Sequence, residues 1–347
     1  MNRKMLEGKE SFRKPEKLTY DQVKNILSNG NLIGDHEVEV KPLSKSTIQE
    51  LSENIPINQL SEISKNVIDS NDDEIPLHYG EWFYYQWRNA VIQVLPESDF
   101  WKLRTVRNRY KINLEEQQLL QSKVVSIVGL SAGNAVLQVL SMEGVGGTFN
   151  IFDFDDFELS NSNRLSYSLF DIGLPKIFLS AREVWERNPY IEINIYSEGF
   201  NDQPEHHQAI MQSDLIIDEC DSFKIKILLR NLAKQYSKPL LMHTSERGIT
   251  DIERHDVQSI SIFNGLLEGV DLNNPNEVLT SIINPSIVSS RMLQSFGEIG
   301  KSIKSWPQLA SEVVAGGANI TTVSRWILMG EQINSGRYFL NCDSVRD

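Results

Sequence analysis

The segment VVSIVGLSAGNAV (residues 124–136) has the pattern of a buried strand, a tight turn and the start of a helix. Gly129 and Gly133 lie in the turn, where glycine lets the backbone approach a phosphate closely. The first N–H groups of the following helix have no partner inside the helix, so they favour an anion. The full glycine fingerprint of dinucleotide-binding proteins is missing, because Ser131 and Asn134 stand where glycine is common. A tight strand–helix turn without a ligand explains the segment equally well.

Apolar β-type runs alternate with helical patterns from residue 123 to residue 245. This alternation is typical of βαβ units that build a parallel sheet. We therefore predict an α/β fold: a Rossmann-like, mostly parallel sheet with helices on both faces, plus a smaller N-terminal α+β region. The predicted domains are an N-terminal accessory domain (1–103) and a second domain (104–347) that ends in helices.

Local patterns add detail at both ends of the chain. The aromatic segment GEWFYYQWRNAVIQVL (80–95) predicts a strand or hairpin whose rings are buried in a core. The helical pattern of residues 305–330 contains Gly316 and Gly317, which would allow close packing. We expect His206 and His207 to be exposed and not to bind a metal.

The composition excludes several classes of protein. The formal net charge of −13 argues against sequence-independent nucleic-acid binding, which needs a basic surface. No apolar run approaches the roughly 18 residues of a membrane span, and the first residues lack the apolar core of a signal peptide. We expect a cytoplasmic protein without membrane partners. Only Cys220 and Cys342 occur, so we expect no zinc site and no disulfide framework within one chain.

The second predicted strand runs into the acidic segment IFDFDDFELSNSNR (151–164). An acid at this strand end, here Asp153 with Asp155 close behind it, commonly holds a ribose hydroxyl in dinucleotide-binding folds. An NAD(P)-dependent oxidoreductase is therefore one interpretation of this strand.

Polar and basic residues that follow the same strand favour a different ligand. Ser160, Asn161 and Arg164 come directly after it, and Lys176 follows in DIGLPK. Two cations and small polar groups suit a triphosphate whose leaving pyrophosphate must be stabilised, whereas an oxidoreductase leaves Arg164 and Lys176 unexplained. A solvated polar loop is the alternative without a ligand.

The later strand DLIIDECDS (214–222) delivers Asp218, Glu219 and Asp221 at its carboxyl end. A carboxylate there would hold Mg²⁺, which is usually bound through one or two acids and several waters. Asp218 would instead cap the structure, so Asp221 is the first candidate. We interpret Cys220 as a small, buried, apolar residue.

These elements together resemble the ThiF/MoeB superfamily, the adenylating fold shared with ubiquitin-activating enzymes, over residues 104 to about 260. The resemblance implies ATP as the nucleotide, Asp153 as a ribose ligand, Asp221 as the Mg²⁺ ligand, and a homodimer. It also implies that a substrate carboxylate attacks the α-phosphate of ATP. The candidate cofactor-binding residues are Gly129, Ser131, Gly133, Asp153, Asp155, Ser160, Asn161, Arg164 and Lys176.

The family also places an arginine upstream of the first strand, where it reaches the ATP of the partner subunit. LRTVRNRYKI (103–112) offers Arg107 and Arg109 with an unusual spacing, so the choice between them is open. Surface ion pairs are an equally good interpretation of either one. We count both with Arg164, Lys176 and Asp221 as candidate catalytic residues.

The whole chain is similar to a bacterial ThiF-like subgroup that is often joined to a nitroreductase-like domain, and we expect a stand-alone member of it. Cys220 and Cys342 are poor nucleophiles, so we expect no enzyme thioester. The expected substrate is a carboxylate, such as that of a peptide, small protein or small molecule. The segment 243–256 would form a wall of its pocket, with Arg247 facing a carboxylate, or else a loop of solvated charges. A non-catalytic partner subunit is the third functional class considered.

Overall fold

The computed structural model describes residues 13–70, 74–244, 246–272 and 274–339. It divides the chain into two compact units. Unit 1 comprises residues 1–117 and 185–190, and unit 2 comprises residues 118–184 and 191–347. The sequence placed the division between residues 103 and 104, and separate folding of two such domains stays a prediction.

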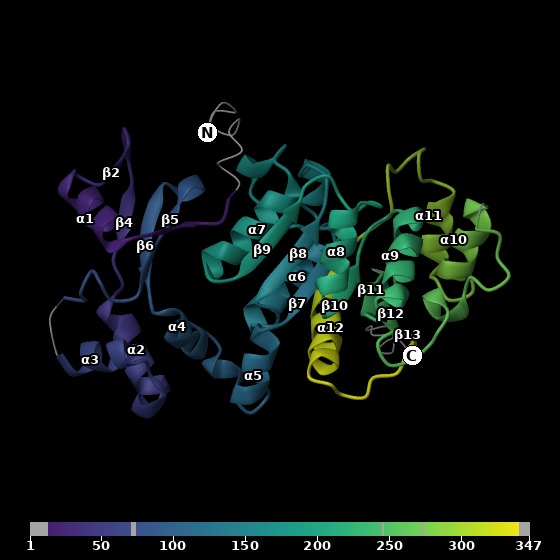
Figure 1. Cartoon of the computed structure of the whole chain (residues 1–347). Coiled ribbons are helices and arrows are strands. Elements are labelled where there is room, and N and C mark those ends of the chain that lie inside the picture. Colours follow the sequence, from purple (N-terminus) through teal and green to yellow (C-terminus); the bar gives the residue numbers. More distant parts are fainter. Residues whose placement is uncertain (1–12, 71–73, 245, 273, 340–347) are drawn as a thin grey trace. The chain divides into compact units, whose positions relative to one another are not determined.

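Unit 1 is the predicted N-terminal α+β region, built on a four-stranded sheet in the order β1-β5-β6-β4 (Figure 1). Strands β5 (Glu81–Tyr85) and β6 (Ala90–Val94) form an antiparallel hairpin, which confirms the prediction for residues 80–95. Three of its rings, Trp82, Phe83 and Tyr85, are buried as expected. The other elements are β1 (Glu16–Leu18), α1 (Tyr20–Ser28), β2 (Leu32–Ile33), β3 (His36–Glu37), β4 (Glu39–Lys41), α2 (Lys45–Asn54), η3 (Ile57–Gln59), α3 (Glu62–Ser70), η4 (Gln86–Arg88), α4 (Glu97–Arg104) and η5 (Val106–Asn108). Helix α5 (Leu114–Gln121) crosses the division between the units.

Unit 2 contains a seven-stranded sheet in the order β13-β12-β11-β10-β7-β8-β9. Five neighbouring strands of this sheet, β11, β10, β7, β8 and β9, are parallel to one another. This arrangement confirms the Rossmann-like prediction. The strands β12 and β13 extend the sheet antiparallel. The bounds are β7 (Val124–Val128), β8 (Thr148–Phe152), β9 (Glu192–Tyr196), β10 (Leu215–Asp218), β11 (Pro239–His243), β12 (Ile249–Arg254) and β13 (Gly336–Phe339).

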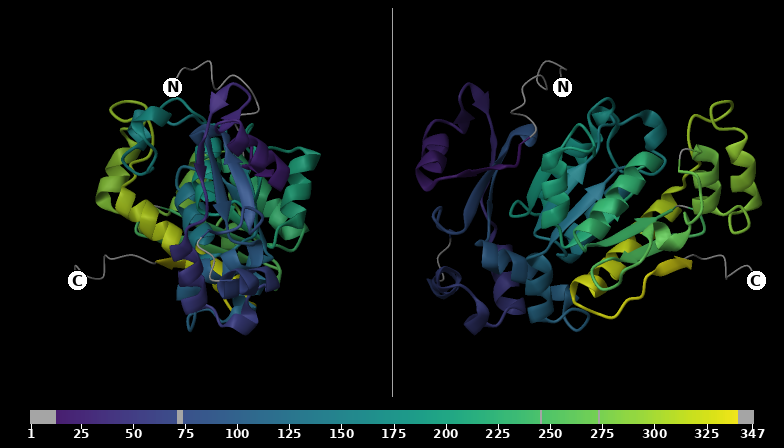
Figure 2. Two further views of the ribbon diagram at one scale, coloured as in Figure 1. Left: turned by 90° about the vertical axis from the view of Figure 1, so that its left-hand side faces the viewer. Right: turned by 45° about the vertical axis from the view of Figure 1, so that its right-hand side comes forward.

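Helices cover both faces of this sheet (Figures 1 and 2). Helices α6 and α12 pack together, and α8 packs with α9. The α8–α9 layer buries Ile210, Leu229 and Leu232 against Phe152 and Ile216 of the strands. The helices are α6 (Gly133–Glu143), α7 (Lys176–Arg187), α8 (Pro204–Gln212), α9 (Phe223–Gln235), α10 (Pro275–Ile283), α11 (Ser290–Phe296) and α12 (Ala310–Leu328), with the short turns η6 (Leu159–Asn161), η7 (Leu169–Asp171) and η8 (Ile262–Gly265).

The close packing of α12 depends on its two adjacent glycines. A β-carbon on Gly317 would lie 2.8 Å from the backbone carbon of Ala135 in α6, and one on Gly316 would lie 2.2 Å from the ring of His243. Real β-carbons do not make such short contacts, so the predicted role of this glycine pair in packing is confirmed. Among the described helices, none is long and apolar enough to cross a membrane.

Candidate active site

The turn between β7 and α6 brings two strand ends together. Gly129 has φ +89°, and its N–H donates to the Phe152 carbonyl oxygen at the end of β8 (2.8 Å). A β-carbon at this position would lie 2.6 Å from the Glu219 carbonyl oxygen, just beyond the end of β10. Glycine is therefore required here both by its left-handed backbone conformation and by the close approach of a second chain segment.

Asp153 lies directly after β8 and is bound to this turn. Its Oδ2 accepts from the N–H of Leu130 (2.6 Å), and its Oδ1 accepts from the N–H of Asp155 (2.8 Å). Burial raises the pKa of Asp153, and the two N–H donors and the charge of Lys176 partly oppose that rise. Each carboxylate oxygen has a second lone pair, so Asp153 is still able to accept a hydroxyl.

The two predicted cations lie beside the turn. Lys176, the first residue of α7, is almost fully buried, and its Nζ lies 3.0 Å from Asp155 Oδ2. Arg164 donates from Nε and Nη2 to Ser131 Oγ in the turn (3.1 and 3.0 Å). Burial lowers the pKa of Arg164, while the charge of Asp221 opposes that effect. The structure thus brings Ser131, Arg164, Asp155 and Lys176 together.

Ser160 and Asn161 lie in η6, beside Arg164. Asn161 is buried, and its Oδ1 accepts from the N–H of Glu158 (3.0 Å), which closes the turn. Ser160 Oγ donates weakly to the Glu158 carboxylate (3.4 Å). The oxygen of Asn161 therefore shapes the loop that carries Arg164, and a phosphate contact from Asn161 or Ser160 stays a prediction.

The acids after β10 have different surroundings. Asp218 is fully buried, and its carboxylate pairs with Lys226 (3.0 Å) and Arg230 (2.5 Å) of α9. Although burial alone would raise it, these cations lower the pKa of Asp218 to about 2. Arg230 also pairs with Glu253 of β12 (2.6 Å). Asp218 is thus committed to a buried ion network, which favours Asp221 over Asp218 as a metal candidate.

Asp221 is exposed, and its carboxylate interacts electrostatically with Arg164, Lys176 and Lys226. Its partial enclosure raises its pKa; the charge of Lys226 lowers it, Asp155 raises it, and Arg164 and Lys176 lower it. Among the described residues, no group of three or more His, Cys, Asp or Glu side chains would enclose a metal ion. Mg²⁺ needs fewer, because it keeps several waters and often uses one or two carboxylates. The Asp221 carboxylate fits that requirement.

Glu219 and Cys220, which lie between these acids in the sequence, are half-buried and line the pocket described below. Glu219 Oε1 accepts from the His243 N–H (2.9 Å), and burial raises the pKa of Glu219 to about 8. The Cys220 thiol donates to Asp218 Oδ1 (3.1 Å), and burial together with that carboxylate raises the pKa of Cys220 well above its usual range. The hydrogen bond of the Cys220 thiol and its raised pKa are those of a structural thiol. Cys342 lies outside the described residues.

The sequence offered two interpretations of the segment 243–256. The loop of solvated charges is wrong for Ile249–Arg254, which form the buried strand β12. The pocket wall is supported, because His243, Thr244, Glu246 and Ile249 line the pocket described below. Arg247 is exposed before that strand, and its Nη1 donates to the Ile287 carbonyl oxygen (3.0 Å).

The expectation that His206 and His207 are exposed is also wrong. His206 is buried because the inner face of α8 packs its ring on Phe200. His207 is half-buried and contacts Asp202.

Arg107 and Arg109 belong to unit 1 and are exposed. Arg107 lies in η5, and Arg109 follows it and donates to the Asn54 carbonyl oxygen (3.3 Å). The action of either arginine at a nucleotide stays a prediction.

The sequence analysis missed the partners of Asp218. Lys226 and Arg230 stand four residues apart on an otherwise largely apolar stretch of α9. Residues four apart share one face of a helix, so this pair of cations was a usable signal for a buried carboxylate nearby.

A comparison with known protein families identifies the part of the chain that carries this site. The model of the family described as "ThiF family" matches residues 105–256, which include the turn, both cations and the acids after β10. Residues 105–256 are a ThiF-family domain. The resemblance inferred from the ordered motifs is thereby confirmed.

Two curated relatives of this chain illustrate the match. The Mycobacterium tuberculosis protein MT1398 is 36% identical over 293 residues, which cover 82% of this chain and 41% of that protein. A protein of Thermus thermophilus named sulfur carrier protein adenylyltransferase is 28% identical over 133 residues, covering 38% of this chain and 48% of that protein. The chain thus spans less than half the length of either relative.

A solved structure shares the fold. The chain resembles Escherichia coli MccB, solved with AMPCPP and MccA, at 16% identity and a TM-score of 0.50. The match covers 69% of this chain and 71% of that one. At this identity the likeness concerns the fold alone.

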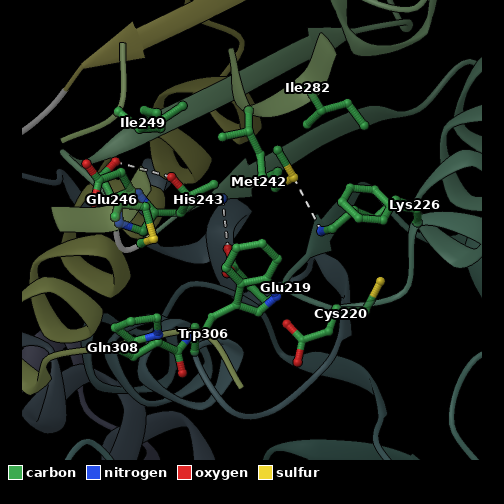
Figure 3. Close-up of a pocket in the computed structure, with 18 of the residues that line it drawn as sticks. Glu219, Cys220, Lys226, Met242, His243, Glu246, Ile249, Ile282, Trp306 and Gln308 are labelled. Atoms are coloured by element: carbon green, nitrogen blue, oxygen red, sulfur yellow. Dashed lines mark hydrogen bonds between the residues drawn. The ribbon is translucent and has the colours of Figure 1, made fainter. Parts of the chain in front are cut away.

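A pocket opens beside this group of residues (Figure 3). It has a volume of about 170 Å³ and is lined by Ala132 of the turn, by Asp221, and by side chains from β11, α10 and α11. Through Ala132 and Asp221 this pocket adjoins the turn and the segment after β10.

Proposed function

We propose that this protein uses ATP to adenylate the carboxylate of a substrate. A carboxylate oxygen attacks the α-phosphorus, an acyl–oxygen–phosphorus bond forms, and the bond from the α-phosphorus to the bridging oxygen breaks. The products are an acyl-adenylate and pyrophosphate. The observation that carries the proposal is the gathering of Arg164 and Lys176 with Asp153 and Asp221 around the Gly129 turn of a ThiF-family domain.

Each of these groups has a distinct role in the proposal. Asp153 accepts a ribose hydroxyl, and the start of α6 offers its N–H groups to phosphate. Arg164 and Lys176 neutralise the charge that grows on the departing pyrophosphate, which lowers the barrier most in a site arranged in advance. Asp221 would hold Mg²⁺, and that ion supplies further neutralisation of phosphate charge.

We propose that the nucleophile that accepts the acyl group is not a cysteine of this enzyme. The Cys220 thiol is turned toward the Asp218 carboxylate, and a nearby negative charge disfavours the thiolate that a thioester requires. The name of the Thermus thermophilus relative supports adenylyl transfer. For this chain we propose a peptide, a small protein or a small molecule as the carboxylate substrate, a homodimeric cytoplasmic enzyme, and Arg107 or Arg109 as a further contact to ATP.

Exchange of labelled pyrophosphate into ATP tests the proposal. The assay would use Mg²⁺-ATP and a panel of short peptides and free amino acids that differ in the residue bearing the free carboxyl group. We expect exchange with some members of the panel, loss of at least about 100-fold for Asp221→Ala, and normal exchange for Asp202→Ala. Asp202 is an exposed acid elsewhere in the same unit and serves as the control. Exchange that is unchanged in Asp221→Ala would contradict the assigned role.

A further inference from the structure

The walls of the pocket beside Asp221 are mostly apolar (Figure 3). Met242 of β11, Ile249 of β12 and Ile282 of α10 are buried side chains that line it. Met292 of α11 and Trp306 also line it, and the Trp306 ring packs edge-on against Phe296 of α11 (5.1 Å between ring centroids). An apolar group of a ligand would therefore be favoured here over water.

The cationic side chains of these walls are already paired with acids inside the protein. Lys226 pairs with buried Asp218 (3.0 Å), and Arg337 pairs with buried Asp251 (2.6 Å). These are the two cationic side chains among the described residues of the lining, so neither is available to hold a carboxylate deep in the pocket. A ligand carboxylate is instead favoured outside the pocket, toward Arg164 and Lys176, which interact electrostatically with Asp221.

The mouth of the pocket is joined to the nucleotide site. Ala132 of the turn, Asp221 and Gln308 all line the pocket. The carbonyl oxygen of Gln308 accepts from Asn163 Nδ2 (2.8 Å), which stands next to Arg164 in the chain. A carboxyl group reacting at the turn would therefore place its neighbouring substituent at the entrance of the apolar pocket.

The size of the pocket indicates which substituents fit. Its volume is about 170 Å³, and an apolar cavity of about 150 Å³ is large enough for a benzene ring. We propose that the pocket holds a branched aliphatic or aromatic side chain adjacent to the carboxyl group that is activated. The inference rests on the proposed adenylation, and it names the substrate class: an amino acid or peptide C-terminus ending in a residue such as leucine or phenylalanine, and not in glycine.

Stable mimics of acyl-adenylates test this inference by direct titration. The probes are 5′-O-sulfamoyl adenosines acylated with glycine, leucine or phenylalanine, and Mg²⁺-ATP is titrated in parallel. We expect the leucine or phenylalanine probe to bind at least about tenfold tighter than the glycine probe, because it buries several additional apolar carbons.

Filling the pocket supplies the matched variants. Met292→Trp would occupy the pocket from α11 and should abolish the advantage of the larger probes, while leaving the glycine probe and ATP bound. Leu293→Trp is the control, because Leu293 is an exposed neighbour on the same helix and does not line the pocket. Ile283→Trp fills the pocket from α10 if Met292→Trp fails to fold.

The outcomes separate the two claims. A preference for the large probes that Met292→Trp removes and Leu293→Trp keeps supports the inference. Equal or tighter binding of the glycine probe overturns the inference, and so does a preference for the large probes that neither Met292→Trp nor Ile283→Trp reduces. In either case, retained ATP binding leaves the proposed adenylation intact. Failure to bind both ATP and every probe would contradict the proposed function itself.

Discussion

Gly129 and Glu219 approach each other so closely that a β-carbon on Gly129 would lie 2.6 Å from the Glu219 carbonyl oxygen. The contact joins the turn after β7 to the segment after β10, so it positions Asp221 beside the turn. Gly129→Ala should therefore weaken ATP binding at least about tenfold and lower the free energy of unfolding by at least about 3 kcal/mol. Isothermal titration and urea unfolding measure the two effects.

Gly330→Ala separates the steric effect from backbone strain. Gly330 has a similar φ of +83°, and a β-carbon there would meet nothing within 4 Å. Gly330→Ala should lower the free energy of unfolding by about 1 kcal/mol and leave ATP binding unchanged. Equal effects of the two substitutions would show that the close approach to Glu219 has no consequence.

The buried cation Arg230 should be important for stability. Arg230→Met leaves Asp218 without one of its cations and Glu253 without the guanidinium that it accepts from, both in fully buried positions. We expect a loss of about 3–5 kcal/mol in the free energy of unfolding. Lys304→Met removes the exposed pair with Glu158 and should cost less than about 1 kcal/mol. A loss for Arg230→Met as small as that for Lys304→Met would argue against the buried network.

His243 predicts a pH dependence of stability. Burial lowers the pKa of His243 from 6.5 to about 4, so the unfolded chain takes up a proton at higher pH than the folded protein does. The contribution of His243 to the free energy of unfolding therefore decreases by roughly 3 kcal/mol as the pH falls from about 6.5 to about 4.

His243→Gln lacks this titration, whereas the other groups titrate in both proteins. The difference in unfolding free energy between the wild type and His243→Gln, measured by urea unfolding at several pH values, should shift by that amount in favour of the variant on acidification. A difference that stays constant from pH 7 to pH 4 would be inconsistent with a neutral, buried His243.

Cys220 should be dispensable for the adenylation step. Its thiol donates to Asp218 and does not face an activating base. Cys220→Ala should retain pyrophosphate exchange within about threefold of the wild type, since only a modest packing change is expected. Mass spectrometry of the intact protein after turnover should show no added acyl group. An acylated wild type together with an unmodified Cys220→Ala would establish the thioester that the proposal excludes.

The parallel core of the sheet was predictable because its strands are short, mostly apolar runs that alternate with helical patterns, as expected for βαβ units. Strand β12 was missed because it contains Asp251, Glu253 and Arg254, which read as a solvated segment. In the fold these charges are buried together with distant partners: Arg337 for Asp251 and Arg230 for Glu253. Such partners lie far away in the sequence, so no local pattern identifies them.

The residues of the candidate site likewise fall into those that the sequence predicts and those that only the tertiary structure brings together. The turn, Asp153 and Lys176 were predicted because they follow a strand or begin a helix, where parallel sheets gather ligand-binding groups. Arg164 was predicted because it lies in the polar segment after the second strand. The sequence did not identify the pocket wall from Met292 and Trp306. Those residues come from a region of short helices after the sheet, and only tertiary packing brings them to Asp221.

The most direct test of the central claim is a titration of Mg²⁺-ATP and, separately, NAD⁺ into wild type, Lys176→Met and Lys234→Met. Lys234 is an exposed lysine in the last turn of α9 and controls for the loss of one positive charge. The account predicts that the wild type and Lys234→Met bind ATP in preference to NAD⁺, and that Lys176→Met binds ATP about 10- to 100-fold more weakly. Preferential binding of NAD⁺, or ATP binding unchanged by Lys176→Met, would contradict it.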